Sequence, residues 1–330
     1  MTHAHHDAPV VPPAGDHGGD GAHVAAALGL DPDEVLDLSA TLNPFAPDVA
    51  GLARRHLGAL RRYPDVQAAE ATVAEGLGLP GDRVVLTAGG AQAIALVAAQ
   101  VRTGWVDEPD FSLYGRHLVH LDPRAPRWRS DPHSPSGRLA GPDAQAGVWD
   151  EAFLPLSAGV WTRGRPGWAL GSFTKAFACP GLRVGYAVAP DGDEADALRR
   201  ARPAWAVGAL ACAVLPELLA HADPVGWTRN LIAARTQLVS VLGGHGWQAL
   251  PSDAPWVLVP GAGGLRDALA RRGVVVRDCS SFGLPDHVRI AVPDGDGLDR
   301  LDRALAAVGA RARHDGGMPP GPPRRPRAPG

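Results

Sequence analysis

Residues 171–188 read GSFTKAFACPGLRVGYAV and contain Lys175, the only lysine in a chain of 330 residues. The other 31 basic residues are all arginine. An arginine side chain supplies positive charge, but its guanidinium stays protonated and cannot attack a carbonyl carbon as an amine does. The retained lysine therefore predicts a covalent reaction with a carbonyl group.

The polar residues around Lys175 are suited to a phosphate group. Ser172 offers a hydroxyl, and Arg183 offers a planar fork of donors. The charge of Arg183 would also lower the pKa of the amine, which is about 10.4 when unperturbed. A strand–helix turn adds backbone N–H groups and the positive end of a helix dipole. The residues of that turn are Gly89, Gly90 and Ala91.

Lysine, hydroxyl and arginine together indicate an aldehyde that carries a phosphate, and pyridoxal phosphate fits this description. Asp150, at the end of the expected strand 147–153, is the candidate partner of its ring nitrogen. Tyr114, in the stretch FSLYGRHL, is the candidate for stacking on the ring. Taken singly, each has an ordinary alternative: a strand-end charge for Asp150, and a half-buried aromatic residue for Tyr114.

Apolar spacing along the chain predicts an α/β protein with a mostly parallel sheet. Short β-branched segments alternate with helical patterns, and the stretch 161–168 is expected to be a loop whose arginines reach solvent. Strands are expected at 82–88, 147–153, 167–173, 183–189, 256–261, 273–279 and 288–294. Helices are expected at 21–30, 65–79, 90–101, 265–273 and 297–310.

The composition bounds the function. A net charge of -3 gives no reason to expect nucleic acid as a partner. No apolar run approaches the ~20 residues of a membrane span, and the N-terminus has no signal-peptide pattern. The three cysteines are widely spaced and predict no metal site. We therefore expect a cytoplasmic protein that binds neither membrane nor metal.

The stretch SFTKAFACPGLRVGY resembles the S-x-x-K-x-x-x-x-x-G-x-R-x-G-Y signature of class I/II aminotransferases. Within that family, DHGGDGAHVAAALGL and VLDLSATLNPF resemble the N-terminus of the threonine-phosphate decarboxylases of cobalamin synthesis. The histidinol-phosphate aminotransferases are their near relatives. The resemblance runs from about Asp16 to Ala310.

This resemblance implies the aspartate aminotransferase-like fold, pyridoxal-phosphate fold type I, and a homodimer with shared active sites. It implies a small domain of residues 15–45 plus 206–310 and a large cofactor-binding domain of residues 46–205. The tails 1–14 and 311–330 are expected to be disordered. The expected reaction is decarboxylation of L-threonine O-3-phosphate to (R)-1-amino-2-propanol O-2-phosphate.

The resemblance also implies further site residues. Tyr63, in RRYPD, would reach the cofactor phosphate of the partner subunit, and Arg289, in VRIAVPD, would hold the substrate carboxylate. Ser134 takes the position of an asparagine that binds the ring hydroxyl, with a shorter reach. The remaining substrate candidates are Asn43 of the Ser-Ala-x-x-Asn-Pro motif, and His17 and Arg277 for the substrate phosphate.

One departure from the family concerns the large domain. Only 12 residues separate Gly137 from Asp150, too few for the usual crossover helix plus strand. Two alternatives stay open beside the decarboxylase. One is an aminotransferase of the histidinol-phosphate type, and the other is a non-catalytic protein of the same fold.

Overall fold

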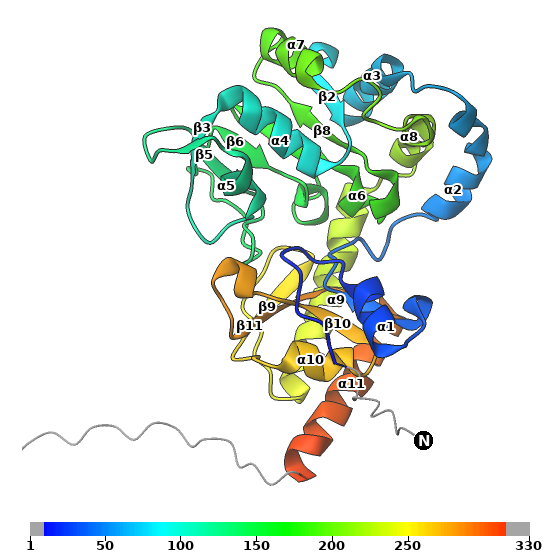
Figure 1. The fold of residues 1–330 in the computed structure, drawn as a ribbon, viewed down its shortest axis with the longest axis vertical. Coiled ribbons are helices and arrows are strands. Elements are labelled where there is room, and N and C mark those ends of the chain that lie inside the picture. The colour runs from blue at the N-terminus through cyan, green and yellow to red at the C-terminus, as the bar shows by residue number, and fades with distance from the viewer. Residues whose placement is uncertain (1–9, 315–330) are drawn as a thin grey trace, which may run out of the picture.

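The computed structural model describes residues 10–314, with side chains up to residue 309. Its larger sheet has seven strands in the order β2-β8-β7-β6-β5-β3-β4 (Figure 1). β8 runs antiparallel to both of its neighbours, and the remaining pairs are parallel, as predicted. The strands are β2 (Val84–Thr87), β3 (Thr103–Val106), β4 (His120–Leu121), β5 (Arg127–Ser130), β6 (Val148–Asp150), β7 (Trp168–Ser172) and β8 (Gly185–Val188).

A smaller sheet joins segments from both ends of the chain. Its order is β1-β10-β11-β9, in which β1 and β10 are parallel and the other pairs are antiparallel. Figure 1 shows this sheet below the larger one, with the blue N-terminal segment beside the orange C-terminal strands. The strands are β1 (Leu36–Leu38), β9 (Trp256–Pro260), β10 (Val274–Asp278) and β11 (His287–Ala291). The chain thus has the predicted α/β fold.

The predicted helices form with recognisable ends. Asp65 caps α3 by accepting a hydrogen bond from the Ala68 N–H at 3.0 Å, and Gly78 ends it with φ +68°. None of the helices in residues 10–314 is long and apolar enough to cross a membrane. The helices are α1 (Gly21–Leu28), α2 (Val49–Arg55), α3 (Val66–Leu77), α4 (Gly90–Val101), α5 (Leu113–His117), α6 (Phe173–Ala176), α7 (Gly192–Ala201), α8 (Ala209–Ala220), α9 (Pro224–Gly244), α10 (Leu265–Ala270) and α11 (Gly295–His314).

The glycine of the Arg-x-Gly-Tyr segment is required by close backbone packing. A Cβ on Gly185 would lie 2.8 Å from the carbonyl oxygen of Gly171 and 2.8 Å from backbone atoms of both Gly89 and Gly90. β8 can therefore lie against the turn that starts α4 only if this position carries no side chain. The signature places Lys175 and the start of α4 on the same side of the sheet because of this contact.

The crossover between β5 and β6 contains no helix, as the short spacing predicted. The loop is held instead by Asp131, whose fully buried carboxylate lies 2.7 Å from the Arg165 guanidinium and accepts from the Ala140 N–H at 2.8 Å. Arg165 stacks over Trp149 of β6, with its guanidinium carbon 4.0 Å from the ring centroid. The arginines of the loop 161–168 were expected to reach solvent, but Arg165 does not. Its contacts with Asp131 and Trp149 hold the β5–β6 loop in the place of a crossover helix.

The ordered chain extends further at both ends than the predicted tails allow. Val11 is buried against Val24, Ala270 and Val275, and α11 continues to His314. The rest of the two predicted tails lies outside the described residues. The domain division stays a prediction, but α8 packs against α2 and α3 beside the larger sheet. This packing favours a second boundary at the connection between α8 and α9.

We expect Arg165→Ala to lower the free energy of unfolding by about 3–5 kcal/mol, because it leaves the buried carboxylate of Asp131 without its near partner. Arg163, whose nitrogen lies 3.8 Å from that carboxylate, would keep the loss toward the lower end. Urea denaturation measures the change. The control is Arg124→Ala, whose side chain is 90% exposed and pairs with Asp122 at the surface, so no measurable loss is expected. Equal stability of the two variants would contradict the role of Arg165.

Candidate active site

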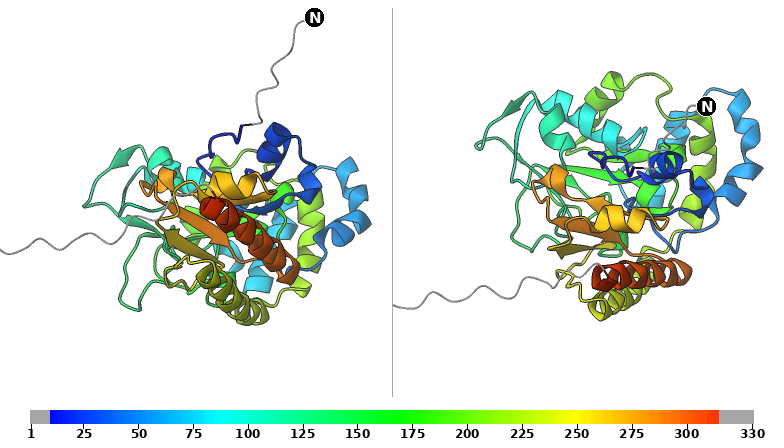
Figure 2. Two further views of the ribbon diagram at one scale, coloured as in Figure 1. Left: turned by 90° about the horizontal axis from the view of Figure 1, so that it is seen from below. Right: turned by 60° about the horizontal axis from the view of Figure 1, so that its bottom comes forward.

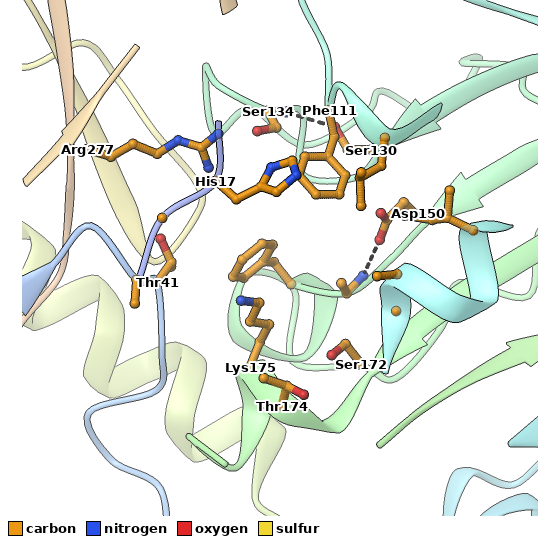
Figure 3. Close-up of a pocket in the computed structure, with 18 of the residues that line it drawn as sticks. His17, Thr41, Phe111, Ser130, Ser134, Asp150, Ser172, Thr174, Lys175 and Arg277 are labelled. Atoms are coloured by element: carbon orange, nitrogen blue, oxygen red, sulfur yellow. Dashed lines mark hydrogen bonds between the residues drawn. The ribbon is translucent and has the colours of Figure 1, made fainter. Parts of the chain in front are cut away.

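A cavity of about 270 Å³ lies where the carboxyl ends of β5, β6 and β7 meet the smaller sheet and the N-terminal segment (Figure 3). Ligands of open α/β sheets bind at this edge of the strands. Most of the residues predicted from the sequence line it. They are His17, Gly90, Ala91, Tyr114, Ser134, Asp150, Ser172, Lys175, Arg183, Arg277 and Arg289.

Lys175 is on α6, directly after β7, and points into the cavity (Figure 3). Removal from bulk water, together with the charges of Arg289 and Arg183, lowers the pKa of its amine to about 8. About a tenth of the amine is therefore neutral at pH 7, whereas the ordinary lysine pKa would leave well under a thousandth of it neutral. This is the state that a lysine needs in order to attack an aldehyde.

Asp150, at the end of β6, is the carboxylate that faces Lys175 across the cavity. Burial raises its pKa to about 6, while hydrogen bonds from the Ala152 N–H at 3.1 Å and the Tyr114 hydroxyl at 2.8 Å act in the opposite direction. A protonated ring nitrogen placed beside this carboxylate would stabilise its ionised form. The position and charge of Asp150 thus fit the partner of a pyridine nitrogen.

The structure gives Tyr114 a different task from the predicted stacking. Its side chain is fully buried, and its hydroxyl donates to Asp150. Phe111 is only half-buried and presents its ring to the cavity beside His17, with the two ring centroids 5.4 Å apart (Figure 3). Phe111 is therefore the better placed of the two to stack on a ring in the cavity. Both residues belong to the stretch FSLY, and spacing alone could not decide which one faces the cavity.

The start of α4 forms a cradle that fits a phosphate. Gly90 and Ala91 line the cavity at the N-terminus of this 12-residue helix, with Ser172 and Arg183 beside them. A Cβ on Gly89, which has φ +83°, would lie 2.7 Å from the Arg183 guanidinium, so this arginine closes over the helix start. Gly89 itself caps the helix without lining the cavity.

Thr174 gives a further sign that this cradle receives a polar group. Its Oγ1 is buried and has no hydrogen-bond partner in the structure. The residue lines the cavity between Ser172 and Lys175. Because an unpaired buried hydroxyl is costly, a ligand oxygen at this place would stabilise the site. The residues present therefore fit pyridoxal phosphate.

Two arginines form a second anion site opposite the cradle. Arg277 of β10 and Arg289 of β11 are directly opposite each other in the antiparallel register, and both are buried. Within the described part of the chain, no carboxylate forms an ion pair with either of them. Burial and the charge of Arg277 lower the pKa of Arg289 to about 9. Like charges paired in this way are destabilising unless an anion lies between them.

Ser134 and His17 complete the walls of this second site. The Ser134 hydroxyl accepts a hydrogen bond from the Arg289 guanidinium at 3.2 Å, so it joins the anion site to the space beside the ring. His17 enters from the N-terminal segment, and burial together with the charge of Arg277 lowers its pKa. Its Nδ1 is buried without a partner, as is Oγ1 of Thr41, a cavity residue that the sequence analysis missed.

Besides Gly89, two predicted residues, Asn43 and Tyr63, do not line the cavity. Asn43 donates its side-chain amide to the Ala176 carbonyl at 2.8 Å, and its backbone N–H donates to the Lys175 carbonyl at 3.1 Å. It therefore holds the lysine segment and does not face the substrate position. Tyr63 lies on the surface with 78% of its area exposed and stacks on Trp205, with ring centroids 4.7 Å apart.

Comparison with known proteins places this site in a family. A family model for aminotransferases of class I and II matches residues 145–308. The chain is 31% identical to a histidinol-phosphate aminotransferase of Halobacterium salinarum, over 86% of this chain and 94% of that protein. The chain belongs to the class I and II aminotransferase family. It is thus a pyridoxal-phosphate enzyme, as the cradle and the Lys175–Asp150 pair had indicated.

Solved structures of this family share the fold. Histidinol-phosphate aminotransferase from Sinorhizobium meliloti, in complex with pyridoxal-5'-phosphate, superposes with a TM-score of 0.75 at 17% identity, over 88% of this chain and 95% of that one. L-Threonine-O-3-phosphate decarboxylase from Porphyromonas gingivalis superposes with a TM-score of 0.70 at 22% identity, over 83% and 99%. Both enzymes thus share the arrangement of the two sheets.

We expect the rate at which the apoprotein takes up pyridoxal phosphate to rise with pH, with a midpoint near 8. The neutral amine of Lys175 is the reacting form, and its folded-state pKa is about 8. The growth of visible absorbance after mixing measures the rate. Lys175→Ala is the control and should develop no such absorbance. A midpoint near 10.5, the ordinary lysine value, would contradict this account of the site.

Proposed function

We propose that this protein transfers the amino group of a phosphorylated amino compound, as an aminotransferase of the histidinol-phosphate type. The observation that carries the proposal is the buried pair of Arg277 and Arg289, which lies across the cavity from the phosphate cradle. One anion site holds the cofactor phosphate, and the other is free for the anionic end of a substrate. The presence of two arginines at this second site indicates a substrate with a high negative charge.

The residues of the cavity suit the chemistry. When bound, pyridoxal phosphate supplies an electron sink for the bonds of the substrate α-carbon. Asp150 holds the ring nitrogen in its protonated form, and Phe111 covers one face of the ring. Lys175, with a pKa of about 8, would take the proton from the substrate α-carbon onto its amine and deliver it to the carbon that was the aldehyde of the cofactor, as amino transfer requires. Arg289 orients the anionic group of the substrate.

We rank transamination ahead of decarboxylation, which is the reverse of the order expected from the sequence. The curated relatives with 30–31% identity over 90% or more of their length are histidinol-phosphate aminotransferases, and this supports transamination. Decarboxylation of threonine phosphate, in cobalamin synthesis, is the second candidate. It is supported by His17, which enters the cavity from the His-Gly-Gly stretch with an unpartnered Nδ1, and by the likeness to the decarboxylase of P. gingivalis.

A two-substrate assay separates these reactions. We expect the purified holoenzyme to form glutamate from 2-oxoglutarate when L-histidinol phosphate is the amino donor. The second candidate requires carbon dioxide release from threonine phosphate without an oxo acid. Production of carbon dioxide at a rate above that of amino transfer would reject the aminotransferase proposal. Inactivity with both compounds would reject both candidates.

Arg277→Ala is the informative variant in this assay. Because hydrogen bonds to a charged group contribute about 1.5–3 kcal/mol, kcat/KM for the phosphorylated donor should fall roughly 10–100-fold. Affinity for pyridoxal phosphate should stay unchanged, since Arg277 lies in the second anion site. Arg272→Ala, in the same α10–β10 region but outside the cavity, is the matched control.

We further propose that the active sites are shared within a homodimer. Tyr63 and Trp205 form an exposed aromatic pair, 78% and 60% accessible, and Leu60 beside them is 66% accessible. Such an exposed apolar patch fits an interface with a second copy of the chain. Tyr63 would then reach the cofactor phosphate of the partner subunit.

Mixing two inactive variants tests this arrangement. Lys175→Ala lacks the nucleophile, and Tyr63→Ala lacks the proposed phosphate contact. After subunit exchange, a mixed dimer should contain one site with both intact residues, and activity should exceed that of either parent. No recovery in a mixture shown to contain mixed dimers would contradict the sharing of Tyr63.

A further inference from the structure

A second buried carboxylate lies behind the wall of the active site. Asp110 follows β3 and is only 3% exposed. Its oxygens accept from the Phe111 N–H at 2.7 Å, from the Ser130 N–H at 3.1 Å and from the Ser130 hydroxyl. No basic side chain in residues 10–309 forms an ion pair with it. A buried carboxylate held only by these donors is costly to retain.

The hydrogen bonds of Asp110 continue to the anion site. The Ser130 hydroxyl, which donates to Asp110, also accepts from the Ser134 backbone N–H at 2.8 Å. The Ser134 hydroxyl in turn accepts from the Arg289 guanidinium at 3.2 Å. Three short links therefore join the carboxylate to the arginine. All of the linked residues from Ser130 onward line the cavity.

Because the side chain of Ser134 is short, this series of hydrogen bonds determines where its hydroxyl lies. A serine hydroxyl is one bond from Cβ, so its position follows the position of its own backbone. That backbone is held by the Ser130 hydroxyl, and the direction of this hydroxyl is set by Asp110. A displacement at Asp110 is thus transmitted to the place at which Arg289 is held.

The donors around Asp110 admit only a carboxylate. Three hydrogens point at its two oxygens, and an amide nitrogen in place of either oxygen would set donor against donor. Burial raises the pKa of Asp110, while the hydrogen bonds donated by Ser130 and the electrostatic interaction with His133 act in the opposite direction.

We propose that Asp110 is a positioning residue, which sets Arg289 for the substrate anion through Ser130 and Ser134 and sets the Phe111 ring through its backbone N–H. This inference rests on the anion-binding role of Arg289 in the proposed function. Asp110 itself does not line the cavity and touches neither cofactor nor substrate. Its effect therefore reaches the substrate only through these neighbours.

Glutarate, a dicarboxylate without an amino group, is the probe, because it can occupy the anion site without reacting. Calorimetric titration of the holoenzyme measures its dissociation constant. For Asp110→Asn we expect roughly a tenfold weaker affinity for glutarate, with the affinity for pyridoxal phosphate unchanged. Ser130→Ala should give a similar loss, and the double variant should lose no more than the single ones, since all three break the same chain.

Glu70→Gln is the matched control. Glu70 is a buried carboxylate that likewise accepts a backbone N–H, from Leu86 at 2.9 Å, but it lies on α3 away from the cavity. This variant should lose stability without losing affinity for glutarate. Weakening by the same factor in Glu70→Gln, or additive losses in the double variant, would show that Asp110 acts only through general stability.

The visible circular dichroism of the bound cofactor gives a second test of the role of Asp110, which does not depend on substrate binding. Asp110→Asn should change this signal, because the Phe111 ring loses its backbone anchor. If the wild-type holoenzyme fails to bind glutarate, the anion role of Arg289 in the proposed function is wrong, and the dichroism alone then decides the role of Asp110. Wild-type dichroism in Asp110→Asn, or wild-type glutarate affinity where the wild type binds it, overturns the proposal.

Discussion

The active site of this protein depends on an excess of buried positive charge around one cavity. Lys175, Arg277 and Arg289 face a space in which Asp150 is the nearest carboxylate among the lining residues. Burial and mutual repulsion lower the pKa of the lysine and of Arg289 together. Such a site is poorly stable when empty and is stabilised by anions. Affinity for phosphate and carboxylate groups and the reactivity of the lysine thus have the same physical origin.

The fold brings these charges together from distant parts of the chain. The larger sheet supplies Lys175, Asp150 and the helix start that cradles a phosphate, while the smaller sheet supplies the two arginines. The N-terminal strand β1 pairs with β10, and the segments on either side of β1 bring His17 and Thr41 into the wall of the cavity. Figure 2 shows the same closeness of the N-terminal segment and the C-terminal strands from two further directions.

This chain also shows how an active site tolerates the loss of family features. The crossover between β5 and β6 has no helix, and the buried pair of Asp131 and Arg165 holds the remaining loop. Ser134 stands where the family resemblance implies an asparagine, and its backbone N–H donates to the Ser130 hydroxyl, which in turn donates to Asp110. Both replacements exchange a local element for a contact between distant residues.

The sequence by itself determined the parts of the site whose chemistry lies within short segments. The lone Lys175, its neighbours Ser172 and Arg183, and the strand-end Asp150 follow from the reactivity of an amine and the needs of a phosphate. The α/β fold followed from apolar periodicity, with the elements close to their expected positions. The family signature made the order of these segments recognisable.

Only the tertiary structure decided which side chains face one another. The Phe111 ring lies beside His17 in the cavity wall while the Tyr114 hydroxyl donates to Asp150, and Asn43 holds the lysine segment. The Ser134–Arg289 contact joins residues 155 positions apart, so no local pattern could reveal it. Periodicity reports whether a residue is buried, but a hydrogen-bond partner depends on how separate elements pack. For that reason the role of Asp110 became visible only in the folded chain.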